Sequence, residues 1–370
     1  MDTIVVSSNT YWSIYNFRLD LIRKLKEKGY KVVIVAPYDE YCEKLNKEFE
    51  CYNIFMDNKG TSPCEDIKTF FEYYRLYRKI KPKIAIHYTI KPNIYGNLAA
   101  KLLNIKIISI ITGLGTPFIR ENFSTKIAKF LYKLSLYCAN KVFFQNKDDF
   151  EFFVKNKLVD EKKCSVLCGR GVDTEKFKPV KINKKDNIFR FLLIARMIWD
   201  KGIKEYIKAA KIIKKKYKNV EFLLLGPGNV KNPTAISMDI IKDWEKEGIV
   251  KYLGVIDDMR KGIVKADCIV LPSYREGISN VLLEGAAMTK PLIATDVPGC
   301  KEVVEDGVNG FLCKVRDIND LVDKMEKMLN LKEEERNKMG LKGREKVIKN
   351  FDEKIIIDKY LKIIEDLLKN

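Results

Sequence analysis

Histidine is almost missing from this chain, because a single one, His87, occurs among 370 residues. This scarcity excludes a histidine-rich metal site and leaves one candidate for histidine acid–base chemistry. His87 stands at the end of a predicted strand, where a hydrogen-bonded structural role is favoured over a catalytic one. The adjacent carboxylates Asp257 and Asp258 do not form an Asp-x-Asp motif, and no acidic cluster suggests a cage for a divalent metal. We therefore expect neither a metal nor another resident cofactor.

The chain also lacks paired cysteine motifs, a signal sequence and a long apolar run. Its nine cysteines form no Cys-x-x-Cys pair, and several lie within apolar runs, where a reduced thiol packs as a small hydrophobe. Met1 and Asp2 lead directly into a predicted strand, without the regions of a secretory signal. The longest weakly polar stretch, residues 107–119, is interrupted by glycines and is too short to span a bilayer. These absences predict a cytoplasmic protein.

Positive charge, in contrast, is abundant and unevenly placed. The formal net charge is +19, and residues 68–141 carry 14 lysines and arginines against two glutamates, Glu72 and Glu121, a local balance of +12. Such a region attracts polyanions, but the sequence contains no recognised nucleic-acid-binding module. The anionic inner face of a bacterial membrane is a second candidate, to which each nearby basic residue contributes about 1 kcal/mol. A solvated face without a partner is the third alternative. We predict peripheral binding to the cytoplasmic membrane surface and no nucleic acid.

Two series of alternating strands and helices predict an α/β protein with two domains, each a parallel sheet covered by helices. The first series has strands at 3–7, 31–36, 52–56, 83–87, 106–111, 141–145 and 164–167, and its first helix at 16–28. The second has strands at 189–195, 220–226, 250–252, 268–272, 291–295 and 310–313, with a short helix at 300–304. The polar, aperiodic segment 177–187 is the predicted linker. We predict domains at 1–178 and 188–350, with the amphipathic stretch 351–370 beyond the needs of the second sheet.

Two carboxylates follow the apolar strand at 268–272. Glu276 stands in a loop beside a glycine, and Glu284 stands eight positions later, about two turns into the next helix. Backbone N–H groups at such a helix start favour a phosphate or a polar sugar. Glu284 can accept hydrogen bonds from the vicinal hydroxyls of a ribose, as an acidic residue does in open α/β sheets. The segment therefore predicts a nucleotide-linked sugar as ligand. Its predicted donor-binding residues are Gly277, Ile278, Ser279, Asn280 and Glu284.

Two cations follow the strand at 189–195 of the same predicted sheet. Arg196 can grip a diphosphate with two parallel hydrogen bonds, while Lys201 adds a point charge. Surface salt bridging is the alternative in a chain with 69 basic residues. The two glutamates at a comparable place in the sheet favour the functional interpretation. We predict Arg196, Lys201 and Glu276 as the catalytic residues.

Two glycine loops of the second half are weaker candidates for donor binding. Gly226 and Gly228 form a Gly-x-Gly turn after a strand, but the full dinucleotide-binding fingerprint is missing, and packing alone explains the turn equally well. Gly254 and Val255 can present backbone groups to a nucleobase, although a glycine after a strand is common.

Candidate acceptor-binding residues follow three strands of the first half. The segment after the first strand is polar and aromatic, and Trp12 and Tyr15 can stack on a sugar or a lipid head group. Asn16 taken alone is better explained as a helix cap, and Arg18 either meets a phosphate or is an exposed helix residue. Glycines after the strand at 106–111 permit close approach of a substrate. The predicted acceptor residues are Trp12, Tyr15, Asn16, Arg18, His87, Lys91, Thr112 and Gly113.

The chain resembles the retaining glycosyltransferases of family 4 almost from end to end. The most specific elements of this resemblance are Arg196 with Lys201-Gly202, the pair Glu276 and Glu284, and the segment 169–179 at the domain junction. Segments 12–18, 91–96 and 112–115 are similar to a narrower group, the bacterial enzymes that extend polyprenyl-diphosphate-linked sugars, including N-acetylgalactosaminyltransferases. The resemblance implies the GT-B fold, in which two Rossmann-like domains face each other across a cleft.

The resemblance also implies roles for individual residues. Arg196 and Lys201 would neutralise the donor diphosphate, Glu284 would hold the ribose, and Glu276 with the residues up to Asn280 would bind the donor sugar and its phosphates. The helix from Phe351 would cross back onto the first domain. Many members carry a histidine where this chain has Thr112-Gly113, so the chain departs from the family pattern there.

The expected activity is α-linked transfer of a sugar, with retention, from a UDP-sugar to an undecaprenyl-diphosphate-linked saccharide. The narrower resemblance favours an N-acetylhexosamine such as N-acetylgalactosamine as the transferred sugar. Preorganised cations and backbone dipoles can stabilise the leaving diphosphate without a metal. Other nucleotide-sugar enzymes, namely a soluble glycan synthase or a UDP-sugar epimerase, remain as alternatives. A basic nucleic-acid-binding protein is the non-enzymatic alternative.

Overall fold

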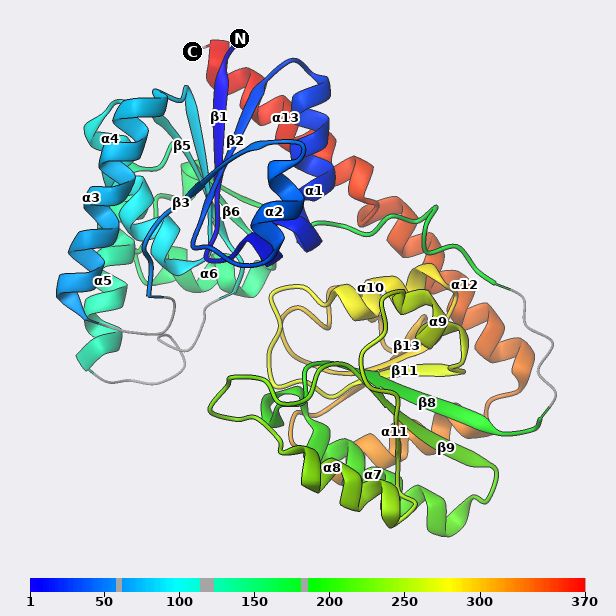
Figure 1. Ribbon diagram of the computed structural model, residues 1–370. Coiled ribbons are helices and arrows are strands. Elements are labelled where there is room, and N and C mark those ends of the chain that lie inside the picture. The colour runs from blue at the N-terminus through cyan, green and yellow to red at the C-terminus, as the bar shows by residue number, and fades with distance from the viewer. Residues whose placement is uncertain (58–61, 114–122, 181–185, 370) are drawn as a thin grey trace. The chain divides into compact units, whose positions relative to one another are not determined.

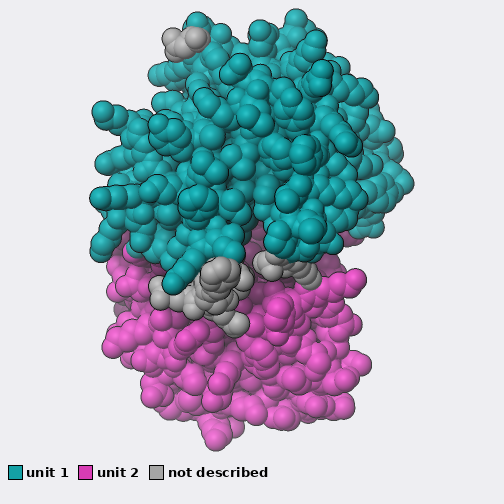
Figure 2. Space-filling view, turned by 90° about the vertical axis from the view of Figure 1, so that its left-hand side faces the viewer, with its two compact units in different colours: residues 1–170, 356–370 teal, residues 171–355 magenta. Residues whose placement is uncertain are grey.

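The computed structural model describes residues 1–57, 62–113, 123–180 and 186–369, and it divides into two compact units (Figure 2). Unit 1 comprises residues 1–170 and 356–370, and unit 2 comprises residues 171–355. This division differs from the predicted limits at 178 and 351. Val172 donates a backbone hydrogen bond to Phe351 (2.9 Å), and Glu353 donates one to Val172 (3.1 Å). These bonds hold the chain after Arg170 to the end of unit 2.

Unit 1 contains a parallel sheet of seven strands in the order β3-β2-β1-β4-β5-β6-β7. Most of its strands are short runs rich in β-branched or aromatic residues, and β1 pairs in parallel with both β2 and β4. The predicted strand at 52–56 is wrong in its limits, because β3 lies earlier in the chain. The strands are β1 (Thr3–Ser7), β2 (Lys31–Ala36), β3 (Glu50–Asn53), β4 (Ile84–Tyr88), β5 (Lys106–Ile111), β6 (Lys141–Phe144) and β7 (Cys164–Val166).

Helices cover both faces of this sheet (Figure 1). Helix α13 (Glu353–Lys369) joins α1 on one face, where Ile356, Tyr360 and Ile364 are buried and the ring of Tyr360 lies 5.7 Å from that of Phe143. The return of the last helix to the first unit is therefore confirmed. The remaining helices are α1 (Tyr11–Glu27), α2 (Tyr41–Asn46), α3 (Pro63–Ile80), the π-helix η1 (Pro92–Gly96), α4 (Asn97–Leu102), α5 (Phe123–Cys138), α6 (Lys147–Lys155) and the 3₁₀-helix η3 (Glu161–Lys163).

Helix α1 begins five residues before the predicted start at Asn16. Thr10 is its N-cap, because the Thr10 hydroxyl accepts a hydrogen bond from the backbone N–H of Ser13 (3.1 Å). The apolar spacing that continues through Leu21 already begins at the buried residues Tyr11 and Ile14. Asn16 thus lies inside the helix and donates to the carbonyl of Trp12 (2.9 Å), so a capping role for Asn16 is wrong.

Unit 2 contains a second parallel sheet, of six strands in the order β10-β9-β8-β11-β12-β13. Its core includes Phe191, Tyr206 and Phe222, whose rings pack together between β8, β9 and α7. The predicted helix at 300–304 is wrong, because these residues form turns. The strands are β8 (Phe189–Ile194), β9 (Val220–Leu225), β10 (Lys251–Tyr252), β11 (Cys268–Leu271), β12 (Leu292–Thr295) and β13 (Gly310–Cys313). The helices are η4 (Trp199–Lys201), α7 (Ile203–Lys216), α8 (Met238–Lys246), α9 (Met259–Val264), α10 (Asn280–Ala287), α11 (Ile318–Asn330) and α12 (Glu333–Asn350).

Each sheet has one point at which the strand order reverses, between β1 and β4 in unit 1 and between β8 and β11 in unit 2. The chain leaves the two strands of such a pair toward opposite faces, which opens a crevice at their carboxyl ends. Residues 195–202 and 272–279 leave the switch point of unit 2, and the segments after Ser7 and Tyr88 leave that of unit 1. These four segments are therefore the places where a ligand of either sheet is expected to bind.

Candidate active site

An ion pair between Lys201 and Glu276 marks the switch point of unit 2. Lys201 Nζ lies 2.5 Å from Glu276 Oε1, and the two side chains are only 19% and 14% exposed. The residues are 75 positions apart in sequence, and the fold brings them together because β8 and β11 are adjacent parallel strands. A cation and a carboxylate in this crevice can bind an anionic, hydroxyl-rich ligand.

The loops that carry this ion pair are fixed to each other. Gly202 has a φ of 72°, and a Cβ atom there would lie 1.9 Å from the carbonyl oxygen of Pro272, so only glycine fits. The backbone N–H of Tyr274 donates to the carbonyl of Asp200 (3.0 Å). These contacts set the position of Lys201 relative to the loop that carries Glu276.

A third loop, after β12, holds Glu276 from the other side. The backbone N–H of Glu276 donates to the carbonyl of Pro298 (3.1 Å), and that of Ser279 donates to the carbonyl of Gly299 (3.0 Å). A Cβ atom on Gly299 would lie 2.6 Å from Glu276. The expected role of the Ser279 N–H toward an anion is therefore corrected, because an internal hydrogen bond already uses that group. Sequence reasoning missed this loop, although a Pro-Gly pair after a strand is a turn signal.

Ser279 instead caps the helix that carries Glu284. Its hydroxyl accepts from the backbone N–H of Leu282 (3.3 Å), and α10 begins at Asn280. Glu284 thus lies just past the first turn of α10 rather than two turns in, and it is 7% exposed. The amino end of α10 and this carboxylate lie on the segment that starts at Glu276.

Two glycine loops follow β9 and β10, and they differ in how closely other atoms approach their glycines. Gly226 has a φ of 134°, and a Cβ atom there would lie 2.0 Å from the carbonyl of Ala195, while one on Gly228 would lie 2.3 Å from Met238 Sδ. Packing therefore accounts for both glycines. In contrast, a Cβ on Gly254 would meet nothing within 4 Å, and Val255 is 68% exposed. Exposed Arg196 lies two residues after the end of β8.

A tyrosine beside Glu276 is anchored by a buried carboxylate that sequence reasoning also missed. The Tyr274 hydroxyl donates to Glu205 (3.0 and 3.1 Å to its two oxygens), and the guanidinium of Arg316 lies 4.5 Å from the Tyr274 ring. Burial, together with the hydrogen bond to Glu205, raises the pKa of Tyr274 to about 12. The neutral hydroxyl holds the Glu276 loop against the first turn of α7.

The predicted acceptor residues of unit 1 lie on three segments that follow β1, β4 and β5. Trp12 is 46% exposed in the first turn of α1 and meets Phe17 edge to face at 5.2 Å. Tyr15 packs against Tyr41, with ring centroids 5.3 Å apart. The guanidinium of Arg18 lies 4.3 Å from the centroid of the Tyr88 ring. This stacking brings Arg18 to the end of β4, at the switch point.

The segment after β4 has an irregular backbone that holds Lys91. Thr89 has a φ of 68°, which is rare for a β-branched residue, and the π-helix η1 follows. Lys91 Nζ lies 2.6 Å from Asp66 Oδ1, and their side chains are 14% and 17% exposed. The side chain of Asn93 donates to the carbonyl of Ile110 (2.8 Å), near Thr112 and Gly113. Strained and π-helical backbone is characteristic of functional sites.

His87 lies within the buried strand β4 and not on the segment that follows it. Its predicted role in acceptor binding is therefore corrected. It has no exposed surface, and its ring nitrogens lie 2.6 Å from the hydroxyl of Tyr77 and 2.6 Å from Asn97 Oδ1. Burial lowers the pKa of His87 to about 4. A Cβ atom on Gly96 would lie 2.6 Å from its Nε2, so the backbone packs tightly on the ring. His87 is a neutral core residue.

Comparison with known proteins identifies the family. Residues 188–331 match the family described as "Glycosyl transferases group 1", and residues 4–146 match "Glycosyl transferase 4-like". The chain is 30% identical to N,N'-diacetylbacillosaminyl-diphospho-undecaprenol alpha-1,3-N-acetylgalactosaminyltransferase of Campylobacter jejuni, over 97% of each chain. The chain therefore belongs to the group 1, family 4-like glycosyltransferases. The expected family membership is confirmed.

The similarity to other proteins also covers nearly the whole length of this glycosyltransferase. UDP-Gal:alpha-D-GlcNAc-diphosphoundecaprenol alpha-1,3-galactosyltransferase of Escherichia coli is 26% identical, over 99% of this chain and 94% of the relative. Sucrose-phosphate synthase from Thermosynechococcus elongatus superposes with a TM-score of 0.82 at 17% identity, over 100% of both chains. Anabaena HepE in complex with UDP and glucose superposes with a TM-score of 0.79 at 15% identity, over 99% and 100%. These structures bear out the GT-B fold.

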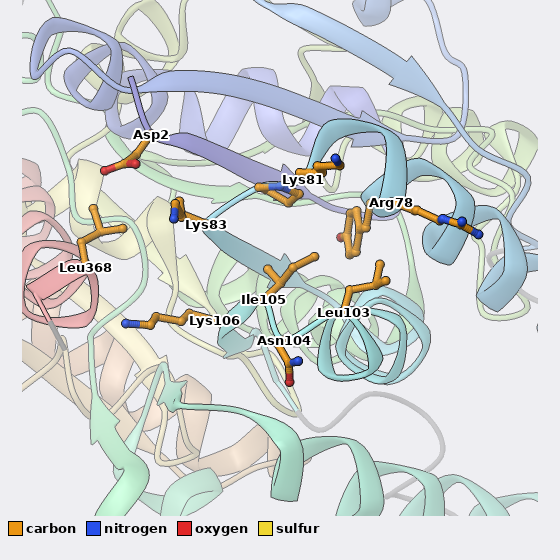
Figure 3. A pocket seen from close by; sticks show the side chains of 11 residues that line it. Asp2, Arg78, Lys81, Lys83, Leu103, Asn104, Ile105, Lys106 and Leu368 are labelled. Carbon is orange, nitrogen blue, oxygen red and sulfur yellow. The ribbon is translucent and has the colours of Figure 1, made fainter.

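A hollow of about 610 Å³ at the opposite edge of the first sheet is distinct from these segments (Figure 3). Basic side chains line it, among them Arg78, Lys81 and Lys83. Helix α3 ends here with Lys81 as its C-cap, and α4 ends one residue before Leu103, which also lines the hollow. Cations at helix carboxyl ends offset the partial negative charge of the last carbonyls, so the end of α3 accounts for Arg78 and Lys81.

Within residues 1–57, 62–113, 123–180 and 186–369, no group of three or more His, Cys, Asp or Glu side chains is arranged to hold a metal ion. Within the same ranges, no helix has both the length and the apolar character needed to cross a membrane.

Proposed function

We propose that this glycosyltransferase moves an N-acetylhexosamine, such as N-acetylgalactosamine, from a UDP-sugar to an undecaprenyl-diphosphate-linked saccharide, in the assembly of a cell-envelope glycan or an N-glycan. The strongest support is the identity of 30% over 97% of the Campylobacter jejuni relative, whose name gives this donor sugar and this kind of lipid acceptor. A second relative from that organism, also an N-acetylgalactosaminyltransferase acting on a diphospho-undecaprenol, is 26% identical over 80% of this chain.

The geometry of unit 2 supports donor binding at the β8/β11 switch point. The diphosphate carries about two negative charges, which Lys201 and the exposed Arg196 offset. Glu276 then turns from Lys201 toward the hydroxyls of the sugar, and Glu284 accepts from the ribose. Gly254 and Val255 leave room for the base. No metal takes part, since the two cations already supply the charge that stabilises the leaving group.

In the proposed mechanism, transfer with retention takes place in one displacement on one face of the sugar. The bond from the anomeric carbon to the diphosphate oxygen breaks, while the acceptor oxygen bonds to that carbon from the same side. The acceptor proton passes to the departing diphosphate. Lys201 stabilises the charge that develops there, as preorganised donors do in other active sites. The alternative is a double displacement with Glu276 as nucleophile, and a glycosyl-enzyme trapped with a fluorinated donor would reveal it.

The acceptor side is assigned to Trp12, Tyr15, Asn16, Arg18, Lys91, Thr112 and Gly113 of unit 1. Lys91 and Arg18 supply the cations that an acceptor diphosphate requires, and Trp12 supplies an exposed ring for a sugar face. Because such an acceptor is anchored in a bilayer, the enzyme acts as a peripheral protein on the inner face of the cytoplasmic membrane. The excess of basic residues in 68–141 supports this location.

The decisive experiment supplies purified full-length protein with UDP-N-acetylgalactosamine and a detergent-dispersed undecaprenyl-diphosphate saccharide. We expect a product one N-acetylhexosamine heavier by mass spectrometry, with an α linkage by NMR, and the same yield with EDTA. Conversion of the donor without acceptor would indicate the epimerase, and transfer to free sugars alone would indicate a soluble synthase. A thermal-shift screen of UDP- and GDP-sugars identifies the nucleotide, because a ligand at 100 times its Kd stabilises the fold by about 2.7 kcal/mol.

A further inference from the structure

Helix α5 of unit 1 carries large apolar side chains on its outward face. Ile127, Phe130, Leu134 and Tyr137 recur at intervals of three, four and three residues, and they are 47%, 66%, 45% and 77% exposed. This spacing places them along one side of the helix. The other side already fills the core, where the ring of Tyr132 packs against Phe153. The outward face is therefore apolar beyond what folding of the unit requires.

The charge of α5 indicates what covers this face. The helix contains Lys126, Lys129 and Lys133 and not one aspartate or glutamate. Lys126 and Lys133 are exposed on the same side as the apolar residues. Cores of protein–protein interfaces are depleted in lysine, whereas helices that lie in a membrane surface combine lysine with phenylalanine and leucine. The composition thus favours an anionic lipid surface over a protein partner.

Helix α3, in the same layer of unit 1, also exposes large apolar side chains. Ile67 and Phe71 are 56% and 51% exposed, and exposed Arg75 follows on the same helix. Helices α3, α4 and α5 pack on one common core cluster and lie on one side of the sheet (Figure 1). Because α3 and α5 follow parallel strands, both helices begin at the carboxyl edge of the sheet. Lys91 and Trp12 lie at this edge.

We propose that the outward face of α5, with Ile67 and Phe71 of α3, is the surface by which the enzyme docks on a bilayer that contains anionic lipid. The apolar side chains enter the head-group region, and the lysines contact lipid phosphates. The biological role of this docking rests on the proposed function, because a bilayer-anchored acceptor gives it a purpose. Docking itself is measured without catalysis.

The experiment floats the full-length protein with vesicles of phosphatidylcholine alone or with phosphatidylglycerol added. We expect the wild type to bind the anionic vesicles and to leave them as salt rises. Phe130→Ser with Leu134→Ser, and separately Lys126→Glu with Lys133→Glu, should each reduce the bound fraction at least about tenfold. All four side chains are largely exposed, so the fold should be retained, which circular dichroism checks.

Matched controls come from α12 of unit 2. Leu341 and Ile348 are 55% and 44% exposed, so Leu341→Ser with Ile348→Ser removes a comparable exposed apolar pair elsewhere. Lys338→Glu with Lys349→Glu changes the net charge by the same amount at exposed sites. Both controls should bind vesicles as the wild type does. Equal losses in the α5 variants and their controls would overturn the proposal, as would unchanged binding of the α5 variants.

Two further readouts separate docking from the alternatives. A protein that dimerises through Phe130, detected by sedimentation, and that ignores vesicles would refute docking in favour of self-association. Sugar transfer to a detergent-dispersed acceptor should be unchanged in the α5 variants, while transfer to a vesicle-embedded acceptor should fall with binding. If the wild type binds vesicles through α5 but transfers no sugar in detergent, the proposed function fails and the docking surface stands.

Discussion

At the switch point of unit 2, Lys201 and Glu276 form an ion pair on loops that backbone hydrogen bonds hold together. At the switch point of unit 1, the chain leaves β4 through a threonine with a φ of 68° and a π-helix. Exposed Trp12 lies on the segment that leaves β1 at the switch point of unit 1. We infer that unit 2 offers a rigid cradle to one constant group, a nucleotide diphosphate. Unit 1 offers an irregular surface that can be matched to a particular acceptor.

Removing the ion pair should have the largest effect on transfer. We expect Lys201→Met or Glu276→Gln to lower kcat by about 10² to 10³, since a lost preorganised contact to developing charge costs about that much. The measurement is steady-state kinetics with a detergent-dispersed acceptor. Lys211→Met is the matched control, because Lys211 pairs with Glu247 at 2.9 Å on the exposed surface of the same unit. An equal loss in the control would contradict a special role for the first pair.

Displacing the Glu276 loop should have the next largest effect. Gly299→Ala places a Cβ atom 2.6 Å from Glu276 at a φ of 83°, so the loop must shift and kcat should fall at least about tenfold. Gly307→Ala has a similar φ of 74° but meets nothing within 4 Å. It should cost about 1 kcal/mol in stability and leave kcat unchanged. Comparable kcat values for the two variants would remove the argument for a fixed cradle.

Loosening Lys91 should affect the acceptor and not the donor. Asp66→Asn removes the charge that holds Lys91, and we expect KM for the lipid acceptor to rise several-fold, about 1 kcal/mol of lost binding, while KM for the UDP-sugar stays constant. Varying each substrate separately measures both constants. Glu27→Gln, which breaks the exposed pair with Lys24, serves as the control. A change in the donor KM would count against separate roles for the two units.

The smallest effect on activity is expected from His87, although its effect on stability depends on pH. Its folded pKa of about 4 lies below the usual value near 6.5, so the unfolded chain binds the proton more tightly. Stability is therefore fully present above pH 6.5 and declines as pH falls from 6.5 toward 4, by about 1.4 kcal/mol per pH unit. Urea unfolding at pH 7 and pH 5 measures the difference. His87→Gln should flatten it, and the rate profile above pH 6.5 should keep its shape.

The positions of most strands were predictable, because parallel strands that are buried on both faces consist of apolar, β-branched runs. The proximity of Lys201 and Glu276 was also predictable, because the carboxyl ends of parallel strands lie at one edge of the sheet. The start of α1 was missed because Asn16 resembles a cap, whereas Thr10 has the extended backbone that a cap requires. The contacts of Gly299 and Glu205 depend on tertiary approach, which local spacing does not encode. His87 was placed near the acceptor because a strand end alone does not reveal burial.

Helix α13 also has a consequence for how the protein is made. Its residues Ile356, Tyr360, Leu361 and Ile364 complete the interior of unit 1, yet the ribosome synthesises them after all of unit 2. During translation the part of this face that α13 covers therefore stays exposed, beside α1, until more than half of the chain has been synthesised after it. Transiently exposed apolar surface promotes aggregation, so we expect the amino-terminal half to be most prone to aggregate before α13 is synthesised.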